Sequence, residues 1–172
     1  MYVDADGNKY ASPPKAKKKH PYVNVPKGKG TTISYMGYHL ITAKSSQQYK
    51  LKAASKRRGH YKKKKPQYYS MINNRILIAT KPNIGGKLKV SIGSKVNVTF
   101  KKKNGKKKVY KCMIGDFKGA DAPNSWGHYG GKGVVEVIYH NYNPPKGYRK
   151  NKNNPWGAGK VTKITRVGKY KF

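Results

Sequence analysis

Acidic residues are scarce in this chain. Five Asp and Glu stand against forty Lys and Arg in 172 residues, and the formal net charge is +35 at pH 7. Only five of the forty cations are arginine. The excess of cations excludes an acidic disordered protein. A free globule with this charge repels itself, so the composition also implies a partner of opposite charge.

Cysteine and long apolar runs are also scarce. The single Cys112 excludes an internal disulfide, and its neighbours Met113 and Ile114 predict a buried strand position. The five histidines show no metal-ligand spacing, so we expect no metal site. No run of eighteen apolar residues could span a bilayer. The N-terminus lacks the basic and apolar regions of a signal peptide, so we expect any role outside a cell to depend on lysis or on packaging in a particle.

Short apolar segments separated by Gly and Asn turns predict an all-β fold with one small helix. Ser45 and Ser46 can cap a helix that ends at Ala54. Residues 56–66 are predicted to form a basic loop. Strands are predicted at residues 31–36, 75–80, 88–92, 96–100, 109–114, 134–138 and 161–167.

Composition divides the chain into three parts. Residues 1–30 are rich in Pro and Lys and have few apolar anchors, which is typical of an extended arm. Such an arm is either a solvated linker or a segment that orders along a partner. Residues 31–140 hold the helix and most of the strands, and residues 141–172 form a basic Asn/Lys/Pro-rich extension that ends in a strand.

Three of the five acids, Asp116, Asp121 and Glu136, fall within 21 residues. Two carboxylates that face one pocket can divide the roles of acid and base, and a glycan bond is then a natural substrate. Alternatively, Asp116 caps a turn and Glu136 pairs with one of the many lysines. Spacing alone favours this structural alternative.

Five motifs occur in the order found in a known family. They are Ser34–Thr42 with Ser45–Leu51, Asn74–Ala79, the hairpin marked by Ile92, Gly93, Asn104 and Gly105, Lys111–Lys118, and Gly133–Ile138. Together they resemble the double-psi β-barrel family, RlpA-like and 3D-domain-like, of clostridial and phage cell-wall-associated proteins. The resemblance covers about residues 31–140.

This resemblance implies a small six-stranded double-psi β-barrel and work on peptidoglycan. It further implies that Asp116 is the acid of a lytic-transglycosylase-like cleavage, with Glu136 or Asp121 in support. The chain departs from the family where further acids are usual, because Gly37, Lys56–Arg58 and Tyr139–His140 stand there. A domain that replaces acids with lysines can keep the fold and lose the chemistry.

We therefore expect a phage- or virion-associated structural protein whose cations bind nucleic acid, an anionic cell-wall polymer or acidic neighbouring subunits in a multi-copy particle. An active peptidoglycan-cleaving enzyme and a sequence-independent nucleic-acid-binding protein are the alternatives. No cofactor is expected. Lysines act as point charges and suit contact with phosphates regardless of sequence. The residues expected to bind the polyanion are Lys17, Lys18, Lys19, Arg57, Arg58, Lys62, Lys63, Lys64, Lys65, Lys101, Lys102 and Lys103.

Overall fold

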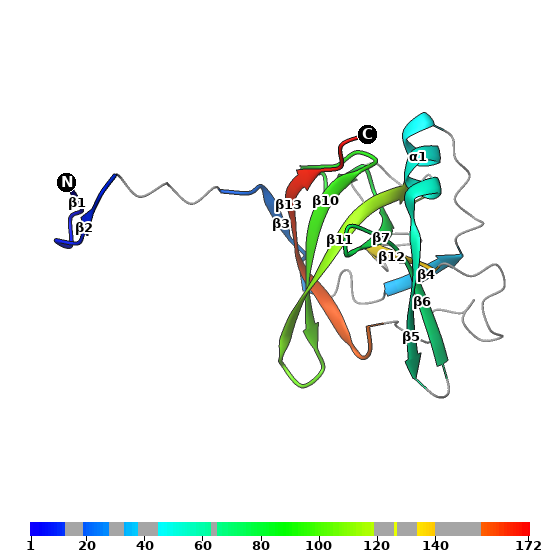
Figure 1. Ribbon diagram of the computed structural model, residues 1–172. Coiled ribbons are helices and arrows are strands. Elements are labelled where there is room, and N and C mark those ends of the chain that lie inside the picture. Colours follow the sequence, from blue (N-terminus) through cyan, green and yellow to red (C-terminus); the bar gives the residue numbers. More distant parts are fainter. Residues whose placement is uncertain are drawn as a thin grey trace.

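The structure is a computed structural model that describes residues 1–12, 19–27, 33–37, 45–62, 65–118, 126, 134–139 and 156–172, with the backbone alone at 33–37, 58–62, 65–68 and 139. The prediction of a mostly β fold with one short helix is confirmed (Figure 1). The elements are β1 (Tyr2–Val3), β2 (Lys9–Tyr10), β3 (Tyr22–Asn24), β4 (Ile33–Gly37), α1 (Ser46–Ala54), β5 (Lys56–Lys62), β6 (Lys65–Ile72), β7 (Arg75–Thr80), β8 (Asn83–Ile84), β9 (Leu88–Lys89), β10 (Ser94–Lys102), β11 (Lys107–Phe117), β12 (Val135–Tyr139) and β13 (Gly159–Lys169).

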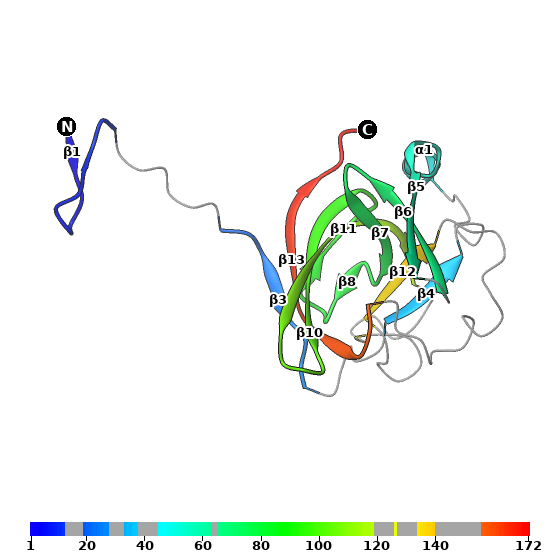
Figure 2. The same cartoon turned by 60° about the horizontal axis from the view of Figure 1, so that its bottom comes forward.

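Nine of the strands form one mixed sheet. Its order is β3-β13-β10-β11-β7-β12-β6-β5, with β4 attached to β12. The long strands are strongly twisted, as Figures 1 and 2 show. The two ends of this path do not pair, so the described strands by themselves make an open sheet and not a closed barrel.

Two pairs of strands run parallel, and both lie near the middle of the sheet. β11 pairs with β7, and β12 pairs with β4. β7 and β12 are antiparallel neighbours, so the two parallel pairs are joined side by side in the sheet through β7 and β12. Parallel neighbours require a long connection between them, so this centre cannot be built from successive hairpins.

The core lies on one face of β10 and on both faces of β7. Val96, Val98 and Phe100 are fully buried and alternate with half-exposed polar residues. This alternation is typical of a strand with one face in the core and the other exposed to solvent. In β7 the whole run from Ile76 to Thr80 is buried, as predicted for a central strand. Cys112 is also fully buried, in β11, as the sequence predicted.

The helix begins where the sequence predicted. Ser45 is its N-cap, and the side-chain Oγ of Ser45 accepts a hydrogen bond from the backbone N–H of Gln48 at 3.2 Å. Leu51 is buried to 1% exposure, so the helix is anchored by one face only.

The prediction of a basic loop at residues 56–66 is wrong. These residues instead form β5 and the start of β6, a long hairpin whose register runs from Lys56 opposite Met71 to Lys62 opposite Lys65. The buried residues of the hairpin are on the second strand, where the whole run from Tyr69 to Ile72 is buried. The sequence of the first strand predicts a loop because its lysines and arginines leave no alternation of apolar and polar residues.

The described part of the N-terminal segment contains three short strands. β1 and β2 pair as a small hairpin around Gly7, whose φ of +83° is one that glycine adopts without strain. β3 joins the main sheet by pairing with β13, and its Val23 is buried. The sheet thus extends past residues 31–140 at both ends, through β3 and β13.

Candidate functional site

Two of the three predicted catalytic acids lie in one row of the sheet. Ala79 of β7 pairs with Asp116 of β11 on one side and with Glu136 of β12 on the other. Residues paired in this way point to the same face, and two strand spacings separate the two acid Cα atoms by about 10 Å. The third acid, Asp121, lies outside the described residues.

A β-bulge places Asp116 in this row. The register shifts between Ile114 and Asp116, so Gly115 is the extra residue of β11. A Cβ atom added to Gly115 would lie 3.3 Å from Cδ1 of Ile138, which explains why a glycine suits the bulge.

The Asp116 carboxylate ties the helix to the sheet. Its Oδ1 accepts a hydrogen bond from Nε2 of Gln48 at 2.9 Å and another from the backbone N–H of Phe117 at 2.8 Å. Gln48 is itself buried, on the inner side of α1. A charge-assisted bond to a buried amide is a strong fixing contact, so the geometry gives Asp116 a structural role whatever else it does.

Two lysines that the sequence analysis did not assign to a site lie close to the acid row. Lys81 follows β7, Lys118 follows β11, and both are more than nine-tenths buried. The backbone N–H of Lys118 donates to the Thr80 carbonyl at 3.0 Å, which extends the parallel ladder by one step. Both lysines are two residues beyond members of the acid row, Ala79 and Asp116, and share their face.

Two carboxylates and two lysines thus occur within two residues of one another along the paired ends of β7 and β11 and the neighbouring β12. Buried lysines are rare unless they are partnered, and all four residues have interaction partners. The sequence carries a signal for Lys81, which directly follows the predicted strand 75–80, but not for Lys118, because the strand predicted at 109–114 in fact runs on to Phe117.

A second candidate site is built by lysines on the outer face of β13, β10 and β11. Lys101 of β10 stands opposite Lys107 of β11 and also opposite Lys160 of β13. These positions alternate with the buried Val98 and Phe100, so their side chains point away from the core.

The neighbouring rows add further cations and no acid. Lys163 stands opposite Thr99, and Lys111 opposite Asn97. We call the lysine face the set Lys95, Lys101, Lys107, Lys111, Lys160 and Lys163. All six are at least partly exposed, and Tyr22 of β3, 56% exposed, borders them with its ring 4.3 Å from Nζ of Lys163.

Arg75 holds part of this face in place from β7. Its Nη1 donates to Oδ1 of Asn97 at 3.1 Å and to the carbonyl oxygen of Cys112 at 3.2 Å. Partial burial lowers the pKa of Arg75 by disfavouring its charged form, and the buried Cys112 thiol acts in the opposite direction. The guanidinium still remains charged in any protein, so these acceptors stabilise a permanent cation.

The predicted cations Lys101–Lys103 lie at the end of the β10–β11 hairpin. The turn is closed by the N–H of Gly105, which donates to the Lys102 carbonyl at 2.9 Å, and by Oδ1 of Asn104, which accepts from the N–H of Lys106 at 3.0 Å. The hairpin thus presents a run of lysines on both of its strands.

Of the other predicted polyanion-binding residues, Lys19 and Arg57 are exposed. Arg58, Lys62 and Lys65 belong to the β5–β6 hairpin, whose far end points to the same side of the molecule as the β10–β11 hairpin (Figure 1). Lys17, Lys18, Lys63 and Lys64 lie outside the described residues.

In the part of the chain that the structure describes, no group of three His, Cys, Asp or Glu residues could hold a metal ion. No helix there is long and apolar enough to cross a membrane. Comparison with known proteins found no matching family model, no similar curated protein and no similar solved structure.

Proposed function

We propose that this chain is a structural protein of a phage or similar particle that binds a polyanion through the lysine face. The observation that carries the proposal is the row Lys160–Lys101–Lys107, in which three like charges stand directly opposite one another on adjacent strands. Like charges in this arrangement destabilise a sheet, so an array kept without an acid is explained by an anion that neutralises it.

Nucleic acid is the polyanion that fits best. The face offers lysines at sheet spacing and no arginine fork, which favours point contacts with phosphates over reading of base edges. Binding of this kind is independent of sequence and strongly dependent on salt. An anionic cell-wall polymer and an acidic subunit of the same particle are the alternative partners.

The scaffold proposed for this function is a double-psi type of barrel. The two parallel pairs, β7–β11 and β4–β12, joined through antiparallel β7 and β12, support it because hairpins alone do not produce such a centre. The motif order supports it independently, and the proposed place in a virion or other extracellular particle follows from that resemblance.

The proposal is tested by the salt dependence of binding to a fluorescent single-stranded DNA of twenty nucleotides. The test variant is the triple Lys101→Gln, Lys107→Gln and Lys160→Gln. The control variant removes the same charge elsewhere, at the exposed Lys50, Lys87 and Lys89.

Loss of three phosphate contacts should lower the slope of log K against log salt by about 2 for a single strand. The control triple should leave that slope within about 0.5 of the wild type, because its lysines lie off the face. Equal losses in both triples would show that net charge alone drives binding, and the proposed face would then be wrong. Repeating the titration with an anionic wall polymer and with an acidic protein identifies the preferred partner.

A second candidate function is cleavage of peptidoglycan, and the row Glu136–Ala79–Asp116 is the observation that favours it. Two carboxyl groups on one face, with only a methyl side chain between them, are compatible with an acid and a base. Clearing of purified peptidoglycan by the wild type and not by Asp116→Asn or Glu136→Gln would establish this activity. If neither the wild type nor either variant clears peptidoglycan, the cleavage activity is refuted and the structural role stands.

A further inference from the structure

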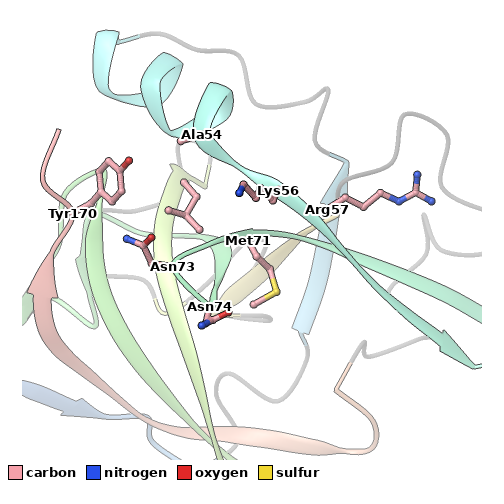
Figure 3. Close-up of a pocket in the computed structure, with 8 residues that line it drawn as sticks. Ala54, Lys56, Arg57, Met71, Asn73, Asn74 and Tyr170 are labelled. Carbon is pink, nitrogen blue, oxygen red and sulfur yellow. The ribbon is translucent and has the colours of Figure 1, made fainter.

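A pocket of about 410 Å³ lies apart from both candidate sites, where α1 ends and the β6–β7 turn approaches the C-terminal segment (Figure 3). Its walls come from four separate parts of the chain: Ala54 of the helix, Lys56 of β5, residues 71–74 and Tyr170. The volume falls in the range of about 300–1,000 Å³ that holds small ligands in proteins.

The lining combines an apolar floor with polar groups that carry no negative charge. Met71 and Ile72 are buried and supply apolar surface. Lys56, Asn73 and Asn74 supply an ammonium group and two amides, and no acid lines the pocket. In Figure 3 Lys56 lies beside Ala54 at the top of the pocket, whereas the guanidinium of Arg57 extends away from the turn.

Tyr170 forms a fixed aromatic wall. Its backbone N–H donates to the Gly93 carbonyl at 2.8 Å, and its ring makes an edge contact with Phe172, with centroids 5.1 Å apart. A ring anchored in this way can pack against a flat ligand without first being ordered.

The end of α1 does not repel an anion strongly here. The last-turn carbonyls of Leu51 and Lys52 accept hydrogen bonds from the backbone N–H and Oγ of Ser55, both at 2.9 Å. Lys56 follows directly and opposes the negative end of the helix dipole.

The β6–β7 turn is built from an unusual residue pair for this position. Asn73 and Asn74 both have positive φ, 50° and 59°, which defines a turn whose second position favours glycine. An asparagine at position 74 accepts backbone strain that glycine would avoid, and it places a second amide at the pocket. The presence of asparagine in place of glycine at position 74 is explained if its side-chain amide binds a ligand in the pocket.

We propose that this pocket binds a purine nucleotide, with the base against Tyr170 and the apolar floor, the amides on the base edge and Lys56 on the phosphate. Asparagine amides pair well with the edge of adenine, and an ammonium group suits a phosphate monoester. The nucleotide is either a free molecule or the end of a nucleic-acid strand. The pocket carries this inference by itself, so it does not depend on the lysine face.

The test is calorimetric titration of the full chain with adenosine monophosphate and, separately, with inorganic phosphate, at 0.3 M salt so that diffuse attraction is screened. Asn74→Gly is the sharpest variant because it removes the amide and relieves the strained φ. We expect it to weaken binding of adenosine monophosphate about fivefold while the thermal midpoint stays equal or rises.

Lys56→Met should weaken binding about tenfold, and the matched control Lys50→Met, on the exposed side of α1, should leave it unchanged. The proposal is overturned if both pocket variants bind adenosine monophosphate as the wild type does. It is also overturned if inorganic phosphate binds as tightly, because the base would then contribute nothing.

The two sources of the nucleotide are separated by short single-stranded DNAs that differ only in a 5′-phosphate. If Asn74→Gly weakens binding of the phosphorylated strand alone, the pocket takes a strand end. If it weakens only the free nucleotide, the pocket takes a free ligand. The lysine-face triple should leave binding of the mononucleotide unchanged, so failure of the pocket and failure of the face are distinguishable.

Discussion

Replacing Lys101 by glutamate should stabilise the fold and weaken the function. Lys101 stands between Lys107 and Lys160, so the substitution converts two repulsive cross-strand pairs into two attractive ones. Two unit charges 5 Å apart in water interact by about 0.8 kcal/mol. Inverting two such pairs therefore has an upper limit of about 3 kcal/mol, which side-chain freedom and screening at 0.15 M salt reduce to about 1 kcal/mol.

Urea unfolding of the wild type, Lys101→Glu and Lys101→Gln measures this effect. A gain of about 1 kcal/mol corresponds to a rise of about 2–4 °C in the thermal midpoint for a chain of this size. Lys101→Gln should give about half the gain, because it removes the repulsion and adds no attraction. Both gains in stability should shrink at 0.5 M salt. DNA affinity at low salt should be highest for the wild type, lower for Lys101→Gln and lowest for Lys101→Glu.

A Lys101→Glu protein that is no more stable than the wild type at low salt would refute the idea that these lysines repel one another. Undiminished DNA binding by the same protein would refute their role as a binding surface. The two measurements are independent, since one uses the free protein and the other the complex.

Three further outcomes follow from particular contacts. Burial raises the pKa of the Cys112 thiol, so a thiol reagent at pH 8 should label it only after urea unfolds the chain. Gly159→Ala should destabilise the fold by about 1–3 kcal/mol in urea melts, because the new Cβ would lie 2.3 Å from the Lys101 carbonyl oxygen, and recovery of full stability would contradict that geometry. Hydrogen bonds, the largest of them from the side chain of Asn8, lower the pKa of Asp4, so the β1–β2 hairpin gains stability above the ordinary aspartate pKa and loses it as pH falls through the lowered one. Nuclear magnetic resonance titration of Asp4 should show this lowered midpoint, and Asn8→Ala should raise it.

The parts of the fold that the sequence predicted are those with a local signal. The Ser45 cap, the apolar run of β7 and the turn at Asn104 and Gly105 each depend on residues close in the chain. The β5–β6 hairpin was missed because four of the seven residues of its first strand are Lys or Arg, and the apolar anchors Tyr69 and Met71 lie on the partner strand.

The candidate sites depend on pairings that the sequence does not display. Lys101 and Lys160 meet only because β13 returns to pair with β10, nearly sixty residues later in the chain. Likewise Asp116 and Glu136 share a row because β7 lies between their strands and Gly115 shifts the register by one residue. The net charge predicted that lysines bind a polyanion. The strand order determines which lysines lie side by side on one face of the sheet.

Lysine footprinting tests the central claim most directly. The protein is acetylated sparingly with and without single-stranded DNA, and the modified positions are quantified by mass spectrometry. We predict strong protection of Lys101, Lys107 and Lys160. Little change is expected at Lys50, Lys87 and Lys89, which are exposed but lie off the lysine face. Equal protection of both sets would contradict a defined face and leave a diffuse cationic surface in its place.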